Sequence, residues 1–489
     1  MVFPAKTPLR LPLRRRNRRF RASAPGSVAG RSLLRPLHNP ARPGIGLPRG
    51  VVRVAKGRTL VKGTLLLTVS ALALRGIGVL FHAYLAGVLG AEGMGLLQLV
   101  FTVGALAGTL GSSGSRVAVL QLASAARGRG DPEALSAALR GCLRWALAVS
   151  SAAAAALLLL AGPLSRGLLH EARTAPALRI FAVFLPCAVV CGVLRSTFTA
   201  CGRVRELVAV DILERLVCAG LTVLLLRAAG RDLRRVLGYV LLAGGLASLL
   251  SLVLLALLLR RDRLPRAAPH RGVARLCVPL ALNDYMRAGL GSVEQFLIPW
   301  GLGRHSSPAA GLAAYGIIGA MVFPVLKLPE EMIFSMSDLL IAELSRLKAR
   351  GGRKRLLALV RKSLACAGLL AAVTAAALYF GGPAVGRAVF RSPAAGQMLR
   401  LFSPMVLFLY LDAMTDGLLK GLGRQLWLVR YNSLTNVIDV LGLFTLLPRF
   451  GIWGYIATYA ASHLVNFFLS LRRLLVSLDE IPEERFSVE

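Results

Sequence analysis

The stretch Ala123–Arg140 (ASAARGRGDPEALSAALR) occurs a second time, in diverged form, as Leu344–Arg361 (LSRLKARGGRKRLLALVR). The second copy starts 221 residues after the first, and Cys201-Gly202-Arg203 aligns with Leu422-Gly423-Arg424 at the same offset of 221 residues. The constant offset indicates two matched repeats whose side chains have diverged. Membrane proteins built from two repeats place the substrate path between them. The repeat therefore favours a transporter.

The composition excludes an ordinary soluble protein. Hydrophobic side chains make up 55% of the 489 residues, and the mean hydropathy is +0.64. A helix that crosses the hydrocarbon core needs about 20 mostly apolar residues. Lipid also requires every backbone hydrogen bond to be made within the protein, which here means helices. The predicted fold class is an all-α integral membrane protein.

Twelve segments are predicted as transmembrane helices, six in each repeat. They are 61–89, 92–122, 135–163, 176–200, 206–227, 236–260, 272–302, 308–345, 355–381, 397–420, 426–447 and 451–473. An even number of spans returns each repeat to its starting side, so we expect parallel repeats about the membrane normal. We expect an N-terminal six-helix lobe (57–262), a C-terminal six-helix lobe (263–476) and a central cavity between them.

Basic loops predict the orientation. Arginine and lysine gather near 127–129, 203–205, 260–275 and 348–355, all on one predicted face. Loops on the cytoplasmic side carry an excess of these residues. We therefore predict a multi-pass protein of the inner (cytoplasmic) membrane with both termini, including a tail at 477–489, in the cytoplasm.

The net charge of +37 does not indicate nucleic-acid binding. Fifteen of the 60 Lys and Arg residues lie within 1–60, where no acid occurs. Basic segments beside a membrane are attracted to anionic lipid by about 1 kcal/mol per charge, and this segment lacks the aromatic platforms of single-strand binders. Membrane lipids are thus the expected partner. We expect residues 1–56 to be either a disordered tail or an incorrectly assigned start.

No motif predicts an enzyme or a metal site. The seven cysteines lack metal-ligand spacing, and Cys187 and Cys191, on one helix face, are expected to be small packing residues. A P-loop, a zinc motif and a nucleophile arrangement are all absent from the sequence. We expect no catalysis and no cofactor, and leave open a coupling to Na⁺ or H⁺.

Several short motifs follow one another in a recognisable order. They are Leu74-Arg75-Gly76-Ile77-Gly78, His82, Leu89-Gly90-Ala91-Glu92-Gly93-Met94-Gly95-Leu96, Ser112-Ser113-Gly114, Tyr315-Gly316, Lys327-Leu328-Pro329 and Gly451-Ile452-Trp453-Gly454-Tyr455-Ile456. Together they resemble the stage V sporulation protein B family of oligosaccharide-lipid flippases, within the multidrug/oligosaccharidyl-lipid/polysaccharide exporter superfamily. The resemblance covers roughly 57–476.

The resemblance implies a two-lobed helical bundle whose central cavity opens to each membrane face in turn. Its members move undecaprenyl-linked saccharides, including peptidoglycan precursors, to the outer leaflet. A monomeric flippase for a lipid-linked saccharide, with a role in sporulation or polysaccharide biosynthesis, is the function implied. Pro324 stands near the place where lipid II flippases carry an arginine, and His82 replaces another arginine. These departures leave the glycolipid open.

Charged residues inside the spans are the candidate site. A charge at the bilayer centre costs at least about 2.5–3.5 kcal/mol, so it usually faces a cavity or a partner. Guanidinium groups bind phosphate oxygens in pairs, which suits a pyrophosphate. The predicted substrate-binding residues are Arg75, His82, Arg116, Arg195, Asp284 and Arg287. For Arg116 and Arg195, near helix ends, contact with lipid headgroups is the equal alternative.

A second set of residues is predicted to serve coupling or gating. Asp412 and Asp416 share one face of the tenth span because one helical turn separates them. Gly108 aligns with Pro329 at the repeat offset, which predicts matching helix breaks, a mark of transporter sites. The predicted set is Glu294, Pro329, Glu330, Asp412 and Asp416. For the acids, an ion-pair network that fixes packing is the alternative.

Two other functions compete with the flippase. A cation-coupled multidrug antiporter of the same superfamily would have an acid-dominated cavity, and the arginines of the first half argue against it. A membrane glycosyltransferase that uses the same carrier lipid would carry catalytic groups in a large external loop. The predicted external loops are short, which disfavours the enzyme.

Overall fold

The computed structural model describes residues 57–112, 114–229, 232–261, 264–265, 267–270, 272–349 and 353–480. The predicted tail at 1–56 and residues 481–489 lie outside this part. Its elements are α1 (Gly57–Ser112), α2 (Ser115–Gly128), α3 (Pro132–Pro163), η1 (Leu164–Leu168), η2 (Ala172–Thr174), α4 (Ala175–Ala200), α5 (Val204–Ala229), α6 (Leu233–Arg260), α7 (Val273–His305), α8 (Pro308–Gly316), η3 (Ile317–Val322), α9 (Phe323–Leu326), α10 (Glu330–Ala349), α11 (Arg353–Phe390), α12 (Pro393–Phe402), α13 (Met405–Gly421), α14 (Gln425–Thr445), α15 (Leu447–Phe450) and α16 (Ile452–Asp479).

The described chain is helical and contains no β-strand, which confirms the predicted all-α class. Six of its helical segments are long and apolar enough to cross a membrane, and α12 with α13, bent by 56°, would make a seventh. Other predicted spans, such as α5 and α7, are continuous helices that carry more charged residues. α1 bends at Gly90, which has φ 68°, between the predicted span 61–89 and the predicted span 92–122; the second of these continues into α2.

The repeat is visible in the positions at which helices begin and end. When the first half is shifted by the repeat offset, the start of α3 coincides with that of α11 and the end of α4 with that of α13. The start of α5 likewise coincides with that of α14, and the end of α2 with that of α10. The two halves therefore share one helix plan, as the sequence predicts.

The turns between helices follow the same repeat. In the described residues, only His170 and Arg391 have positive φ without being glycine, at 50° and 52°. These two residues occupy the same position in their respective repeats. Gly202 and Gly423 also occupy matched positions, and their φ angles are 68° and 75°. Left-handed backbone is unusual outside glycine, so its recurrence at matched positions confirms that the halves are structural copies.

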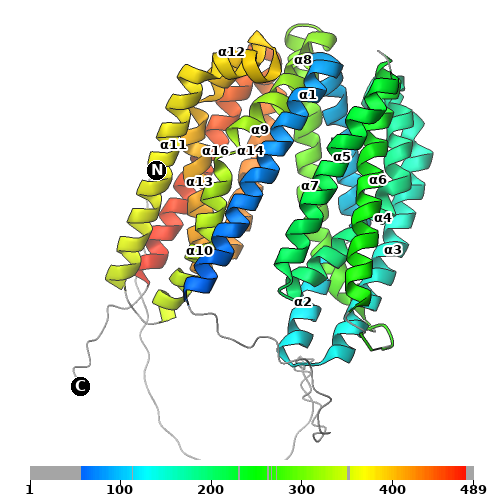
Figure 1. Ribbon diagram of the computed structural model, residues 1–489. Helices are drawn as coiled ribbons and strands as arrows, with labels where there is room; N and C mark the ends of the chain where they lie inside the picture. Colours follow the sequence, from blue (N-terminus) through cyan, green and yellow to red (C-terminus); the bar gives the residue numbers. More distant parts are fainter. Residues whose placement is uncertain are drawn as a thin grey trace, which may run out of the picture. The chain divides into compact units, whose positions relative to one another are not determined.

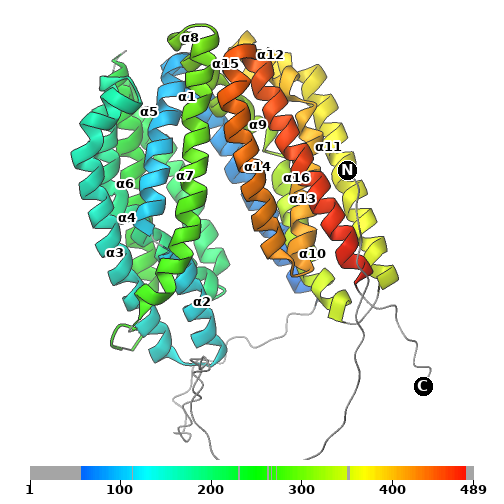
Figure 2. The same cartoon turned by 180° about the vertical axis from the view of Figure 1, so that it is seen from behind.

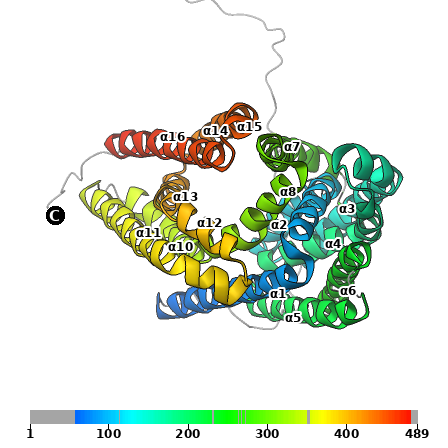
Figure 3. The same ribbon diagram turned by 90° about the horizontal axis from the view of Figure 1, so that it is seen from above.

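The helices gather into two groups (Figures 1 and 2). In one, α4 packs against both α3 and α6, and α5 packs against α6; in the other, α13 packs against α10, α11 and α16. Seen from above, α1, α7 and α8 lie between the groups (Figure 3). This arrangement confirms the two-lobed bundle.

Two glycines bring the halves together. Gly95 of α1 and Gly316 of α8 face each other so closely that a Cβ on Gly95 would overlap the carbonyl oxygen of Leu312. A Cβ on Gly316 would likewise overlap the carbonyl oxygen of Ala91. Gly95 and Gly316 are themselves related by the repeat offset, as are Ala91 and Leu312. Small residues allow membrane helices to approach backbone to backbone, and here the contact is reciprocal. We call this pair of glycines the glycine seam.

The helix breaks differ from the predicted pair at Gly108 and Pro329. Gly108 lies within the helical part of α1 that follows the bend at Gly90, and the next break comes at Gly114, whose φ of 70° precedes α2. In the second half, the π-helix η3 and a turn over 327–329 interrupt the span. The prediction was right for Pro329, which lies in the 327–329 turn, and wrong for Gly108, which stays helical because glycine is tolerated inside a helix; the break in the first half comes at Gly114.

The basic connections lie at one end of the bundle. The ends of α2, α6 and α10, the starts of α3, α7 and α11, and the start of α1 occupy the lower end of Figures 1 and 2. Hydrogen bonds fix this arrangement: Arg140 Nη1 donates to the Ala267 carbonyl oxygen at 2.9 Å, and the backbone N–H of His270 donates to the Ala137 carbonyl oxygen at the same distance. Most of the basic connections thus lie at this end, while Arg234 and Arg235 at the start of α6 and Arg304 at the end of α7 lie at the other. The side of the membrane that each end faces stays a prediction.

Candidate functional site

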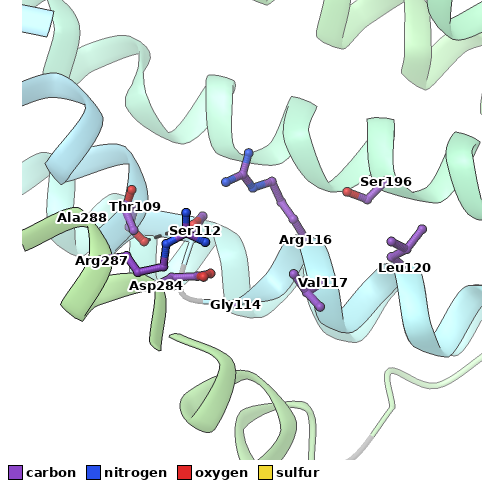
Figure 4. A pocket seen from close by; sticks show the side chains of 10 residues that line it. All are labelled: Thr109, Ser112, Gly114, Arg116, Val117, Leu120, Ser196, Asp284, Arg287 and Ala288. Carbon is purple, nitrogen blue, oxygen red and sulfur yellow. Dashed lines mark hydrogen bonds between the residues drawn. The ribbon is translucent and has the colours of Figure 1, made fainter. Parts of the chain in front are cut away.

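A cavity of about 530 Å³ lies at the break between α1 and α2 (Figure 4). Its polar lining comes from four helices: Thr109 and Ser112 from α1, Arg116 from α2, Ser196 from α4, and Asp284 and Arg287 from α7. The left-handed turn at Gly114 redirects the chain here, and a Cβ on Gly114 would come within 3.0 Å of the Cβ of Leu280. We call this space the cation cavity.

Two arginines give the cation cavity its charge. Arg116 is the second residue of α2, and its Cδ would lie 3.0 Å from a Cβ on Gly192 of α4, so that glycine leaves room for its stem. Figure 4 shows Arg116 extending toward α4 and Arg287 lying beside Ser112 and Asp284. Neither guanidinium forms an ion pair with any carboxylate in the part of the chain that the structure describes.

The surrounding helices hold this geometry. Tyr285, on α7 between Asp284 and Arg287, donates its hydroxyl to the carbonyl oxygen of Leu110 at 3.0 Å. That bond ties α7 to the last turn of α1 beside the cavity. Ser112 donates to the Thr109 carbonyl oxygen at 3.0 Å. The arrangement is a pre-positioned anion site: two positive groups and several hydroxyls around one acid.

A second cavity, of about 620 Å³, has arginines that are already paired. It lies between α1, α4, α5 and the α9–α10 region. Arg75 forms an ion pair with Glu331 of α10. Arg195 forms ion pairs with Glu214 and, at 3.2 Å, with Asp211. These carboxylates pair both arginines, so we call this space the paired cavity; Arg215 and Lys327 also line it.

Two further contacts join the elements around the paired cavity. Ser251 of α6 donates to Glu214 Oε2 at 2.6 Å, which extends the Arg195 network into a third helix. His82 Nδ1 lies 3.0 Å from the carbonyl oxygen of Ala320, so α1 also contacts η3 here. The His82 contact and the Arg75–Glu331 pair attach the first span to the second half of the chain.

The six predicted substrate-binding residues are therefore divided between two cavities. Arg116, Asp284 and Arg287 line the cation cavity, whereas Arg75, His82 and Arg195 line the paired cavity. Sequence reasoning grouped them because each is a charge or histidine within a span. It missed the pairing of Arg75 with Glu331, because the two residues belong to different repeats and nothing local in the sequence connects them.

A buried polar network surrounds Asp412, whose exposed fraction is 6%. His463 Nδ1 lies 2.9 Å from Asp412 Oδ2, and Asn466 donates to Asp412 Oδ1 at 2.8 Å and to Asn432 Oδ1 at 3.1 Å. One turn along α13, Asp416 Oδ1 is buried without a hydrogen-bond donor among the described residues. We call this the aspartate network. Sequence reasoning missed His463 and Asn466 because they lie on α16, three helices further along the chain than α13, which carries Asp412.

The remaining predicted residues lie elsewhere. Glu330 begins α10 directly after the 327–329 turn that contains Pro329, and only 6% of it is exposed. Glu294 lines a third cavity, of about 490 Å³, between α1, α7, α14 and α16. In the described residues, no group of three His, Cys, Asp or Glu side chains could hold a metal ion.

Comparison with known proteins agrees with the resemblance seen in the sequence. The profile of the family described as Polysaccharide biosynthesis protein matches residues 60–276. The stage V sporulation protein B of Bacillus subtilis (strain 168) is 24% identical over 425 residues, which are 81% of this chain and 80% of that protein. The predicted resemblance to stage V sporulation protein B-like proteins is thereby confirmed.

Solved structures share the fold. An inward-facing multidrug resistance MATE family transporter of the MOP superfamily superimposes with a TM-score of 0.64 at 14% identity, covering 84% of this chain and 99% of that one. An outward-facing conformation of a transporter of that family superimposes with a TM-score of 0.59 at 14% identity, covering 86% of this chain and 97% of that one. A MOP superfamily transporter from Pyrococcus furiosus Vc1, described as having a binding pocket of reverse polarity, gives 0.61 at 15% identity, over 85% and 96%.

Proposed function

We propose that this chain, a multi-pass membrane protein with the fold of MOP superfamily transporters and a relative in stage V sporulation protein B, is a flippase for a lipid-linked saccharide. The observation that carries this proposal is the cation cavity, where Arg116 and Arg287 have no carboxylate partner among the described residues. Alternating access of the two helix groups would carry the head group between leaflets. No bond of the cargo is made or broken.

The cation cavity suits a pyrophosphate chemically. Each guanidinium presents paired N–H donors that match two phosphate oxygens, and Ser196 adds a hydroxyl donor, whereas Thr109 and Ser112 already donate their hydroxyl protons to backbone carbonyl oxygens. Both arginines are exposed to the cavity and have no carboxylate partner among the described residues, so a dianionic head group would supply the counter-charge that they lack. Asp284 partly offsets the arginines, which favours release over permanent binding.

The cargo class is supported by the relatives. The matching family profile is named for polysaccharide biosynthesis, and the curated relative for sporulation. We infer an undecaprenyl-linked oligosaccharide or a peptidoglycan precursor as cargo. The protein would act as a monomer in the cytoplasmic membrane, with both termini in the cytoplasm. A small cationic drug, the cargo of an antiporter, would be repelled by Arg116 and Arg287.

We further propose that the aspartate network couples transport to Na⁺ or H⁺. Asp416 has a buried oxygen without a donor among the described residues, and Asp412 lies within reach of a histidine. A cation or proton would satisfy Asp416 and change the balance of hydrogen bonds between α13 and α16. Glu330, at the start of α10, lies next to the turn that such a change would move.

The first test is substitution within the cation cavity. Arg116→Ala and Arg287→Ala should each slow leaflet transfer of labelled undecaprenyl-pyrophosphoryl saccharide in reconstituted vesicles and weaken its binding by about ten- to a hundredfold, the size of a lost charge-assisted hydrogen bond. Arg361→Ala, which removes an exposed arginine of α11, is the matched control. Wild-type rates in both cavity variants would place the head group elsewhere. No transfer of any such lipid by the wild-type protein would refute the flippase proposal.

A further inference from the structure

The third cavity has a lining unlike the other two. Its polar groups are mainly carboxylates and amides, including Glu294 and Gln295 of α7 and Asp439 of α14, and its walls contain the rings of Tyr315, Tyr455 and Tyr459. We propose that this cavity binds the first sugar of the cargo and so selects among glycolipids. The proposal rests on the proposed flippase function. We call this space the saccharide cavity.

The chemistry of a sugar matches this lining. A pyranose carries hydroxyl groups around its edge, which need planar acceptors and donors, and C–H groups on its faces, which pack on aromatic rings. Carboxylate and amide side chains supply the first requirement. Phe101 of α1, which is 36% exposed, supplies the second, beside Tyr455 and Tyr459, whose rings pack on each other and on Phe323. Ligand pockets combine apolar and aromatic walls with polar groups that fix the orientation of the ligand.

One atom of the lining lacks a partner. Glu294 Oε1 is buried and accepts no hydrogen bond from any described residue. Its neighbour Gln295 is held by Tyr315, whose hydroxyl donates to Gln295 Oε1 at 2.8 Å, so the amide NH₂ of Gln295 is turned away from that bond. Buried acceptors in proteins are nearly always satisfied. A sugar hydroxyl or N-acetyl N–H would satisfy Glu294.

The position of the cavity fits a sugar joined directly to a pyrophosphate. α1 and α7 line both the cation cavity and the saccharide cavity. On α1, Ala105 is one turn from Thr109, and on α7, Glu294 is two turns from Arg287, which corresponds to about 10 Å of helix. A head group with its phosphates at Arg287 would therefore place its first sugar near Glu294.

The size and charge of the saccharide cavity favour a sugar over a single cation as its ligand. The saccharide cavity measures about 490 Å³, which holds a sugar ring and leaves a single ion poorly surrounded. Lys327 also lines it and offsets part of the negative charge of its acids. Sequence reasoning gave Glu294 a coupling role, and a Na⁺ ion at Glu294 and Asp439 is the outcome that the experiment must separate from sugar binding.

The test compares two lipids on the full-length protein in nanodiscs. Undecaprenyl pyrophosphate lacks the sugar, and undecaprenyl-pyrophosphoryl-N-acetylglucosamine carries it. We expect Glu294→Ala and Gln295→Ala to weaken binding of the glycosylated lipid about tenfold and to leave the unglycosylated lipid unchanged. Arg116→Ala should weaken both. Glu294→Gln, which keeps the shape of the side chain, is made in parallel, and thermal melting checks that each variant is folded.

Each result decides a separate question. Failure of the wild-type protein to bind either lipid would overturn the proposed function itself. Binding of both lipids with equal losses, or no loss, in the variants would overturn the saccharide cavity alone. If the Glu294 variants lose affinity only in Na⁺ and behave as wild type in choline buffer, the carboxylate binds a cation and the saccharide assignment is wrong.

Discussion

At the scale of single residues, the presence or absence of a partner separates charges that look alike in the sequence. Arg75 and Arg195 are neutralised by carboxylates from other helices, whereas Arg116 and Arg287 have no such partner in the described chain. A paired arginine mainly fixes packing, and an unpaired one in a cavity can receive a ligand. The sequence identifies all four as charges inside spans, but the pairing depends on contacts between distant helices.

Asp412 offers a stability test at this scale. Asp412→Ala should lower the melting temperature of the purified protein in detergent, because the buried donors of His463 and Asn466 lose their acceptor, at about 1–3 kcal/mol for each. Asp412→Asn keeps an acceptor oxygen, so its melting temperature should lie between those of Asp412→Ala and the wild type. Equal melting of Asp412→Ala and the wild type would mean that the aspartate network does not hold α13 against α16.

At the scale of helices, the glycine seam determines how closely α1 and α8 approach. Such a contact needs the absence of a Cβ on both partners. Gly95 and Gly316 both lie in motifs that the sequence shows, but the motifs do not indicate that the two glycines meet. The α1 bend at Gly90 falls between two predicted spans, whereas the first break lies at Gly114 and not at Gly108. Glycine alone does not decide between helix and turn; the backbone angle that packing imposes does.

Gly316→Ala tests the seam. The added methyl group would overlap the Ala91 carbonyl oxygen, so α1 and α8 must separate, and overpacking of this kind destabilises by about 1–3 kcal/mol. We expect a lower melting temperature and slower transport. Gly162→Ala on α3, where a Cβ meets no atom within 4 Å, should melt like the wild type or slightly higher. An unchanged Gly316→Ala protein would show that the seam is not tightly packed.

At the scale of the whole molecule, the repeat supplies most of what the sequence could predict. The all-α class, the two helix groups and the matched helix ends follow from hydropathy and a constant offset, because both are encoded along the chain. The division of the site into three cavities does not, since it arises from side chains that only tertiary packing brings together. The aspartate network has the same origin: α16 contributes His463 and Asn466 to acids on α13.

The connection between α6 and α7 gives a test of this organisation. Residues 1–262 and 263–489, expressed together as separate chains, should copurify and restore transport, because α1 packs against α7 and α8 independently of that connection. Gly316→Leu should abolish copurification by blocking the seam. If the two halves both insert into the membrane but never associate, the covalent link between them is required to form the bundle.

The glycine seam also preserves a trace of ancestry. In a symmetric homodimer, a residue on the two-fold axis contacts its own copy in the partner subunit. Gly95 and Gly316 are copies of one position, and each lies against the carbonyl that corresponds to the other's. The contact therefore has the form of a dimer interface between two six-helix proteins, retained after a gene duplication and fusion made them one chain. Once fused, the two former subunits were free to specialise: the second carries Asp412 and Asp416 where the first carries Cys191 and Arg195, and each contributes one unpaired arginine to the cation cavity.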